Sequence, residues 1–167
     1  FDHIPVVDIS GLIDGSDRDS VAGTINAALK SAGFMYVKGH GIAQDFVDRV
    51  FEVTRAFFDL PLEQKMDLHI SKSGPALRGY IEVFGENTDP GKTMDLKECI
   101  DLGPEWDGPV SPFFGPNPWP GSLPEFRGLA YAYHEAMVVL ARRILGGIAL
   151  SLDLPQDHFD PMLTRPI

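Results

Sequence analysis

The stretch Gly33-Phe34-Met35-Tyr36-Val37-Lys38-Gly39-His40-Gly41 is the part of this sequence that decides the fold. Its centre, Phe34 to Lys38, is aromatic and β-branched, which predicts a buried strand. Gly33 is the kind of residue that ends a helix, and Gly39-His40-Gly41 predicts a turn. Helical patterns stand on both sides. The stretch therefore predicts a short strand between two helices.

Apolar residues recur at helical spacing in several other segments. Ser20 to Ala32 predicts an amphipathic helix, with Asp19 or Ser20 as its cap. Gln44 to Phe58 predicts a second helix, and Pro61 opens a short third one that runs to about Asp67. Glu125 to Leu152 predicts the longest helix, in which Gly146-Gly147 either weakens or bends the helix or allows a neighbour to approach closely.

Alternating residues predict three further strands, at Ile4 to Ile9, Tyr80 to Phe84 and Glu98 to Leu102. The segments expected as turns, loops or connections are Gly11 to Asp19, Ser71 to Pro75, Gly85 to Thr93, the proline-rich Gly103 to Pro124, and Leu154 to Ile167. This order of helices and strands predicts an α+β fold. Four short strands cannot close a barrel, so an open sheet edge is expected unless a helix covers it.

Composition excludes several classes of function. With 24 acidic against 14 basic residues the formal net charge is −10, and 44% of the 167 residues are hydrophobic. A soluble globular domain is expected, which should repel nucleic acid and anionic membrane. No signal peptide or membrane span is visible. The one cysteine, Cys99, predicts a reducing, cytoplasmic location, and its alternating surroundings predict a buried, small apolar residue on a strand.

Several segments, in this order, resemble the N-terminal region of the isopenicillin N synthase-like Fe(II), 2-oxoglutarate-dependent oxygenases. They cover nearly the whole chain: Ile4 to Ser10, Gly33 to Ile42, Phe57 to Lys65, Arg78-Gly79-Tyr80, Asp95 to Glu98 with Asp101 to Gly103, Asn117 to Pro120, and Pro124 to Arg127. The resemblance implies helices and first strands of a double-stranded β-helix, or jelly roll. It implies an oxygenase N-terminal region at residues 1–120, followed at residues 121–167 by the long helix and a connection towards a catalytic half.

The same resemblance implies the chemistry. The family binds Fe(II) through a His-X-Asp and a distant His, because two imidazoles and a carboxylate leave open positions for the oxo-acid and oxygen. A later arginine binds 2-oxoglutarate through a planar two-point match. The substrate is expected to be a small molecule, and the reaction hydroxylation, desaturation or ring closure. Both cofactors are expected to need residues beyond Ile167, so the 167 residues alone are predicted to be inactive.

No complete iron site can be assembled from the histidines of the sequence. His158-Phe159-Asp160 has the His-X-Asp form, but it follows the long helix directly and no histidine comes after it, so a loop pair is expected. His40 is expected to bond backbone near its turn. His134 is expected at the edge of the core or exposed, and no spacing joins these residues into a metal site.

Arg78 and Tyr80 are the candidate substrate-binding residues, because the resemblance places their strand at the mouth of the active site. The alternative is that Arg78 pairs with a surface acid and that Tyr80 fills the core. Glu98 borders the same region, with Met94 and Lys97, and could form a cross-strand charge pair.

Three interpretations of the chain remain open. It is the ordered part of a longer oxygenase, or a catalytically inactive binding module that adds a partner strand to its sheet edge. In the third, two copies complete each other by swapping or edge pairing. Substrate identity and oligomeric state do not follow from the sequence.

Overall fold

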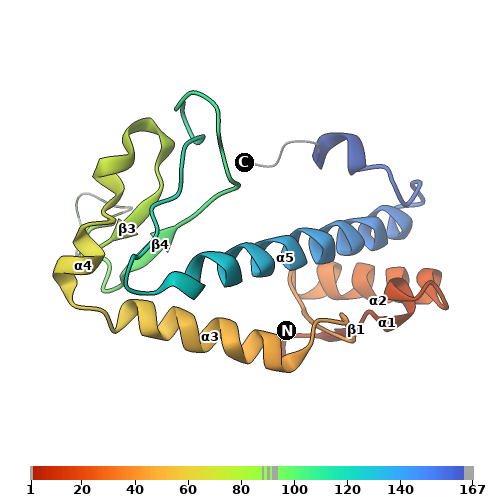
Figure 1. The fold of residues 1–167 in the computed structure, drawn as a ribbon. Coiled ribbons are helices and arrows are strands. Elements are labelled where there is room, and N and C mark those ends of the chain that lie inside the picture. Colours follow the sequence, from red (N-terminus) through yellow and green to blue (C-terminus); the bar gives the residue numbers. More distant parts are fainter. Residues whose placement is uncertain (1, 88, 90, 92–93, 164–167) are drawn as a thin grey trace. The chain divides into compact units, whose positions relative to one another are not determined.

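The computed structural model describes residues 2–87, 89, 91 and 94–163 (Figure 1). The chain forms two compact units, one of residues 1–47 with 131–166 and one centred on residues 48–130. Helices and strands are mixed, so the α+β prediction is confirmed. The jelly-roll assignment and the division of the chain into residues 1–120 and 121–167 stay predictions. The connection predicted at Leu154 to Ile167 includes residues 164–167, which lie outside the described residues.

The first unit contains a two-stranded parallel sheet, β1 (Val6–Asp8) with β2 (Tyr36–Lys38). Both strands were predicted, but β2 is not the buried strand that was expected: Tyr36 is 61% exposed and Phe34, just before it, is 50% exposed. The physical reason is that the core of this unit packs on the face of the sheet that carries Val7 and Val37. The opposite face, which carries the register partners Val6 and Tyr36, stays open.

Two helices join the strands of the first unit. The segment Gly11 to Asp19, which was expected to be a turn, contains most of helix α1 (Ser10–Ile13). At the start of this helix, the Asp8 carboxylate accepts hydrogen bonds from the backbone N–H and the hydroxyl of Ser10. Helix α2 (Arg18–Ser31) starts two residues before its predicted start, and its N-cap is Asp17, not Asp19 or Ser20; the Asp17 side chain makes no cap bond. Gly33, with φ of +82°, ends the helix as predicted.

Helix α5 (Pro124–Ser151) confirms the long helix to within one residue at each end. In the first unit its Leu140, Ile144 and Ile148 pack on a core of Val7, Ile9, Leu12, Val21, Ile25 and Ala28. Of the two expected effects of Gly146-Gly147, close approach is the one seen, because a Cβ at Gly147 would meet Ile25 and Leu12 at 2.9 and 3.0 Å. After α5 comes a short 3₁₀ turn, η2 (Asp160–Leu163).

The second unit is built on helix α3 (Gln44–Phe58), whose predicted bounds are confirmed at both ends. Helical spacing predicts that the apolar face of this helix consists of Phe46, Val47, Val50, Phe51, Thr54, Phe57 and Phe58. This prediction is only partly right: Phe57 is buried, but Phe51 is 69% exposed, and Val53 is buried although it was not included. Helix α4 (Leu62–Met66) follows, with Pro61 at the N-cap and not at the first helical position. Residues Ile70–Ala76 form 3₁₀ turns (η1) broken at Gly74, where a plain loop was expected.

Strands β3 (Gly79–Ile81) and β4 (Cys99–Asp101) form an antiparallel pair in which Tyr80 faces Ile100 (Figure 1). Both strands were predicted, and both are shorter than expected. The connection expected at Gly85 to Thr93 lies partly outside the described residues, at 88, 90, 92 and 93. The proline-rich segment contains neither helix nor strand, as predicted, and its Trp106 ring packs on Phe114 at 5.0 Å. None of the helices in the described part of the chain has the length and apolar character needed to cross a bilayer.

Candidate functional site

Of the two predicted substrate-binding residues, Arg78 directly precedes β3 and Tyr80 is the middle residue of that strand, in the second unit. Tyr80 is only 1% exposed and belongs to a core cluster with Val53, Phe57 and Phe126. The rings of Phe57 and Tyr80 meet edge to face at 6.3 Å, a favourable geometry for an aromatic pair. Tyr80 therefore fills the core, which was the alternative given for it. Whether it also contacts a substrate stays a prediction.

The Tyr80 hydroxyl ends in a buried polar network. It donates to Glu98 Oε2 at 2.6 Å, and the same oxygen accepts from Lys65 Nζ at 2.8 Å. Lys65 also donates to the carbonyl of Phe58 at 2.8 Å and is 6% exposed. A buried ammonium is tolerated only when it is paired in this way. Glu98 thus pairs with a helical lysine, while its contact across the strands is a hydrogen bond from Tyr80.

These contacts shift the pKa values of both acids. Burial, followed by the hydrogen bond to Glu98, raises the pKa of the Tyr80 phenol well above its usual value. For Glu98 burial raises the pKa, but the hydrogen bonds from Lys65 and Tyr80 lower it by more, so the net pKa lies below the ordinary value. Glu98 is therefore an anion and Tyr80 a neutral donor at neutral pH.

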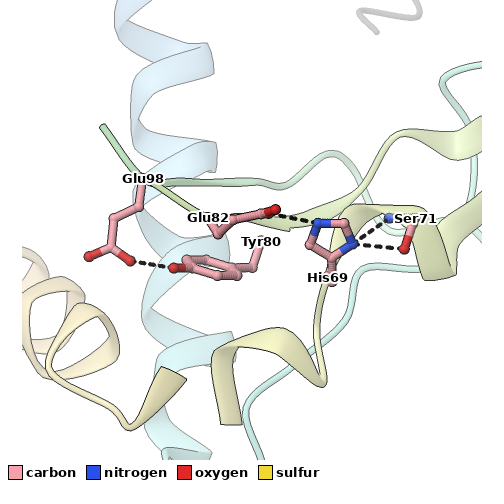
Figure 2. Close-up of polar contacts among 5 residues, drawn as sticks. All are labelled: His69, Ser71, Tyr80, Glu82 and Glu98. Atoms are coloured by element: carbon pink, nitrogen blue, oxygen red, sulfur yellow. Dashed lines mark hydrogen bonds and ion pairs between the residues drawn. The ribbon is translucent and has the colours of Figure 1, made fainter. Parts of the chain in front are cut away.

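A second polar group lies on the other side of Tyr80 in Figure 2. His69 Nε2 is 2.8 Å from Glu82 Oε2, and His69 Nδ1 is 2.7 Å from the Ser71 hydroxyl. The Ser71 backbone N–H also donates to Nδ1, at 3.2 Å, so the neutral ring carries its proton on Nε2 and donates it to Glu82. Bonds from its own backbone and from His69 lower the pKa of Glu82. This group ties η1 to the end of β3.

Arg78 is 8% exposed and has no carboxylate partner among the described residues, so the expected pairing with a surface acid is wrong. Its Nη2 donates instead to the Phe113 carbonyl at 2.6 Å. Its Nε is buried without any hydrogen-bond partner. An unpaired buried guanidinium is costly, because its solvation is not replaced.

A pocket of about 170 Å³ opens beside Arg78. Its walls come from the end of α4, from η1 and from the proline-rich segment. They are formed by Asp67, Leu68, His69, Lys72, Ser73, Arg78, Pro116, Asn117 and Pro118. Tyr80 is not part of this wall. The two predicted substrate-side residues therefore point to different places in the same unit.

The other histidines behave largely as expected. His40 Nδ1 accepts from the Ile42 backbone at 3.1 Å, which confirms its structural role in the turn. His134 is partly exposed, with its Nδ1 3.6 Å from Glu135. His158 packs edge to face on Phe159 at 5.0 Å, and within residues 2–163, apart from the undescribed positions, no three His, Cys, Asp or Glu side chains could hold a metal. The described residues thus do not fit an iron site.

Comparison with known proteins decides the family. A family model described as "non-haem dioxygenase in morphine synthesis N-terminal" matches residues 4–122. This chain belongs to the N-terminal region of the non-haem, 2-oxoglutarate-dependent dioxygenases. The resemblance stated from the sequence is thereby confirmed, and Fe(II) and 2-oxoglutarate are the cofactors of the family.

Individual relatives agree with this assignment. A homoarginine-6-hydroxylase of Arabidopsis thaliana is 35% identical over 97% of this chain and 48% of its own length. The crystal structure of a full-length Neurospora crassa protein in complex with alpha-KG matches with a TM-score of 0.81 and 30% identity, over 94% of this chain and 50% of that one. The same Neurospora protein with alpha-KG and thymine matches with a TM-score of 0.80. The chain spans about half the length of the relatives it matches.

Sequence reasoning missed Lys65 and His69 as parts of the polar network. Lys65 follows Glu63 and Gln64 on a short helix, a pattern typical of a solvated face, so no local signal marks it as buried. The sequence predicts a loop around His69, and its pairing with Glu82 depends on the approach of η1 to β3, which the sequence does not reveal. Glu98 could be found, because it lies at the start of an alternating strand.

Proposed function

We propose that the whole protein is a non-haem Fe(II), 2-oxoglutarate-dependent dioxygenase that oxidises a small molecule by hydroxylation, desaturation or ring closure. The match of the family model to residues 4–122 carries this proposal. Relatives named for the oxidation of small molecules support it, such as the homoarginine-6-hydroxylase. Structures of the Neurospora crassa relative with thymine and with 5-formyluracil support a substrate of similar size.

Residues that bind iron and 2-oxoglutarate are expected beyond Ile167. The chain spans about half the length of its relatives, which supports this expectation. We propose Arg78 and Tyr80 as the substrate-side residues of β3. The pocket beside Arg78 supports the first, while Tyr80 is supported only by its place on the same strand, since its hydroxyl is bonded to Glu98.

Oxygen uptake tests the proposal. The natural full-length protein is expected to consume oxygen only when both Fe(II) and 2-oxoglutarate are present. The chain of residues 1–167, prepared in the same way, is expected to consume none above the buffer rate. Uptake by the short chain would contradict the assignment of the cofactor sites. An iron-loaded full-length protein that turns over no 2-oxoglutarate would contradict the oxygenase itself.

A second candidate is a catalytically inactive interaction module, and one observation favours it. Val6 and Tyr36 are register partners in the β1–β2 sheet, and both are exposed, together with Phe34. Such an apolar face suits a partner that packs on a small sheet or adds a strand to it. Light scattering of the purified natural protein tests pairing between copies through this face, which a monomer at all concentrations measured would exclude.

A further inference from the structure

The buried charge of Arg78 has no counter-charge in the described part of the chain. A guanidinium offers five N–H donors. The only one used by a described residue is on Nη2, which donates to the Phe113 carbonyl. A neutral carbonyl does not offset a positive charge, and Nε stays without a partner although it is buried. Natural proteins rarely bury arginine in this state unless something else pairs with it.

The surrounding residues hold Arg78 in one place. Its backbone N–H donates to Ser73 Oγ at 2.9 Å. The guanidinium lies against the backbone of Gly103, where an added Cβ would collide with Nη2, Cζ and Nε. Gly103 is fixed in turn by Asn117, whose amide oxygen accepts from the Gly103 N–H at 2.9 Å and whose amide nitrogen donates to the Gly103 carbonyl at 2.7 Å. The cation is therefore held rigidly before any ligand arrives.

The charges around the pocket limit what can enter it. Lys72 Nζ is 3.5 Å from Asp67 Oδ1, so these two wall residues neutralise each other. His69 is bonded to Glu82 and Ser71. Arg78 remains as one uncompensated positive charge beside a space of about 170 Å³. A single positive charge with a planar fork matches a carboxylate monoanion better than a doubly charged phosphate, because one guanidinium balances only one negative charge.

We propose that Arg78 and the pocket beside it form a binding site for a small molecule that carries a carboxylate group. The carboxylate pairs with the guanidinium of Arg78. This assignment deepens the substrate role proposed above for Arg78 and rests on it, since it names the group that Arg78 recognises. The evidence for the site itself is the geometry of the pocket and the unpaired cation.

Nuclear magnetic resonance of arginine side chains tests the site directly. The Nε–Hε signal of Arg78 in the natural full-length protein is followed without iron, in chloride-free buffer, while sodium acetate is added. A carboxylate that bonds the guanidinium is expected to move this signal in a saturable way. Inorganic phosphate is the comparison probe, and it should bind more weakly than acetate at pH 7. Arg55, an exposed arginine of the same unit, provides the matched signal that should not move.

Two variants extend the test. Arg78→Lys keeps the charge and removes the fork, and should weaken acetate binding by about tenfold or more, whereas Arg55→Lys should leave it unchanged. Because Arg78 is buried and the lysine variant could fail to fold, Lys72→Gln is the second variant. Lys72 is exposed, so this protein should fold normally. The substitution leaves the negative charge of Asp67 uncompensated in the pocket wall, so acetate should bind a few-fold more weakly.

The possible results separate the proposals. A saturable shift at Arg78 that Lys72→Gln weakens supports the site, whether or not the protein consumes oxygen. No shift of the Arg78 signal up to saturating acetate overturns the site. The site is also overturned if the Arg78 Nε–Hε signal is shifted before acetate is added and does not change on its addition, because an acidic side chain of the protein would then occupy the pocket. If the full-length protein consumes oxygen but the Arg78 signal does not respond to acetate, the oxygenase proposal stands and only the carboxylate site at Arg78 is rejected.

Discussion

Replacing Glu98 by glutamine should destabilise the second unit, and the size of the effect follows from the network around it. The Glu98 carboxylate accepts from Lys65 Nζ at 2.8 Å and from Tyr80 Oη at 2.6 Å. Glutamine keeps an oxygen acceptor but loses the negative charge. The Lys65 ammonium, whose side chain is 8% exposed, would then retain only the Phe58 carbonyl as a full partner.

The magnitude comes from the cost of leaving one member of an ion pair buried, which is about 3–5 kcal/mol for a fully buried pair. The Glu98 side chain is 26% exposed, so water screens part of the interaction. We therefore expect a loss of about 1–3 kcal/mol in the free energy of unfolding at pH 7. Urea unfolding followed by tryptophan fluorescence measures it, because Trp106 and Trp119 both lie in this unit.

The loss of unfolding free energy in Glu98→Gln should depend on pH in a way that identifies the charge of Glu98 as its cause. The folded pKa of Glu98 lies below its ordinary value of 4.5. A carboxyl whose pKa is lowered by folding stabilises the fold fully above that ordinary value, and this contribution is lost as the pH falls through the folded pKa. The difference between the natural protein and Glu98→Gln should therefore be constant above about pH 5.5 and shrink below about pH 4.5.

The matched control is Glu86→Gln, which removes the same charge from the exposed pair between Glu86 and Lys97. Exposed pairs add little, so its unfolding curve should stay close to that of the natural protein. Equal effects of the two substitutions at pH 7 would refute the reasoning. A deficit of Glu98→Gln that persisted unchanged at acid pH would refute it too, because the charge on Glu98 would then not be its cause.

Two further predictions concern the same unit. Gly103→Ala should lower the free energy of unfolding by about 1–3 kcal/mol, because its Cβ pushes the Arg78 guanidinium off the Phe113 carbonyl. Gly121→Ala, where a Cβ meets open space, should change little in the same urea titration. Burial, followed by the charge of Asp101, raises the pKa of the Cys99 thiol above its ordinary value of 9.0. A thiol reagent should therefore label the folded protein slowly at pH 7 and faster only as the pH rises above 9. Rapid labelling at pH 7, at the rate of the unfolded chain, would contradict that shift.

Helices were the most predictable part of the molecule, because their apolar spacing is set by local geometry. The bounds of α3 were predicted in full, and those of α5 to within one residue. The face of α3 was harder, since apolar residues surround much of it. Its periodicity did not distinguish Phe51, which is exposed, from Val53, which is buried. Only the neighbouring strands and α5 residues of the second unit decide which side faces inward.

The positions of the strands could be predicted from the sequence, but the burial of their side chains could not. Phe34 to Lys38 has the composition of a central strand, yet β2 pairs with β1 alone among the described residues, and Tyr36 is exposed. Composition indicates which side chains a strand could bury, but packing on each face of the sheet decides which of them are buried. The same distinction applies to Lys65: its sequence neighbours indicate solvent, but the carboxylate of Glu98, 33 positions later, gives it a buried partner.

Arg78 and Tyr80 show how far the candidate site could be predicted. Both were named because the resemblance places their strand at the mouth of the active site. In a regular strand, side chains two positions apart share a face. Gly79 breaks that regularity. Its φ is +129°, and an added Cβ there would collide with the Leu68 carbonyl, which accepts from the Tyr80 N–H at 2.8 Å. Leu77, also at positive φ, adds a second irregularity just before Arg78.

This break sends the two side chains to different environments. Tyr80 enters the core and donates to Glu98, while Arg78 turns towards Gly103 and the proline-rich segment. The Tyr80 hydroxyl already donates its one proton to Glu98, so it has no donor left for a ligand. The guanidinium of Arg78 is fixed in place and has N–H donors that no described residue uses. Of the two residues named from the sequence, Arg78 is therefore the stronger candidate for contact with a substrate. Replacement of Tyr80 by phenylalanine should consequently cost stability through the loss of the bond to Glu98, and should leave acetate binding at Arg78 unchanged.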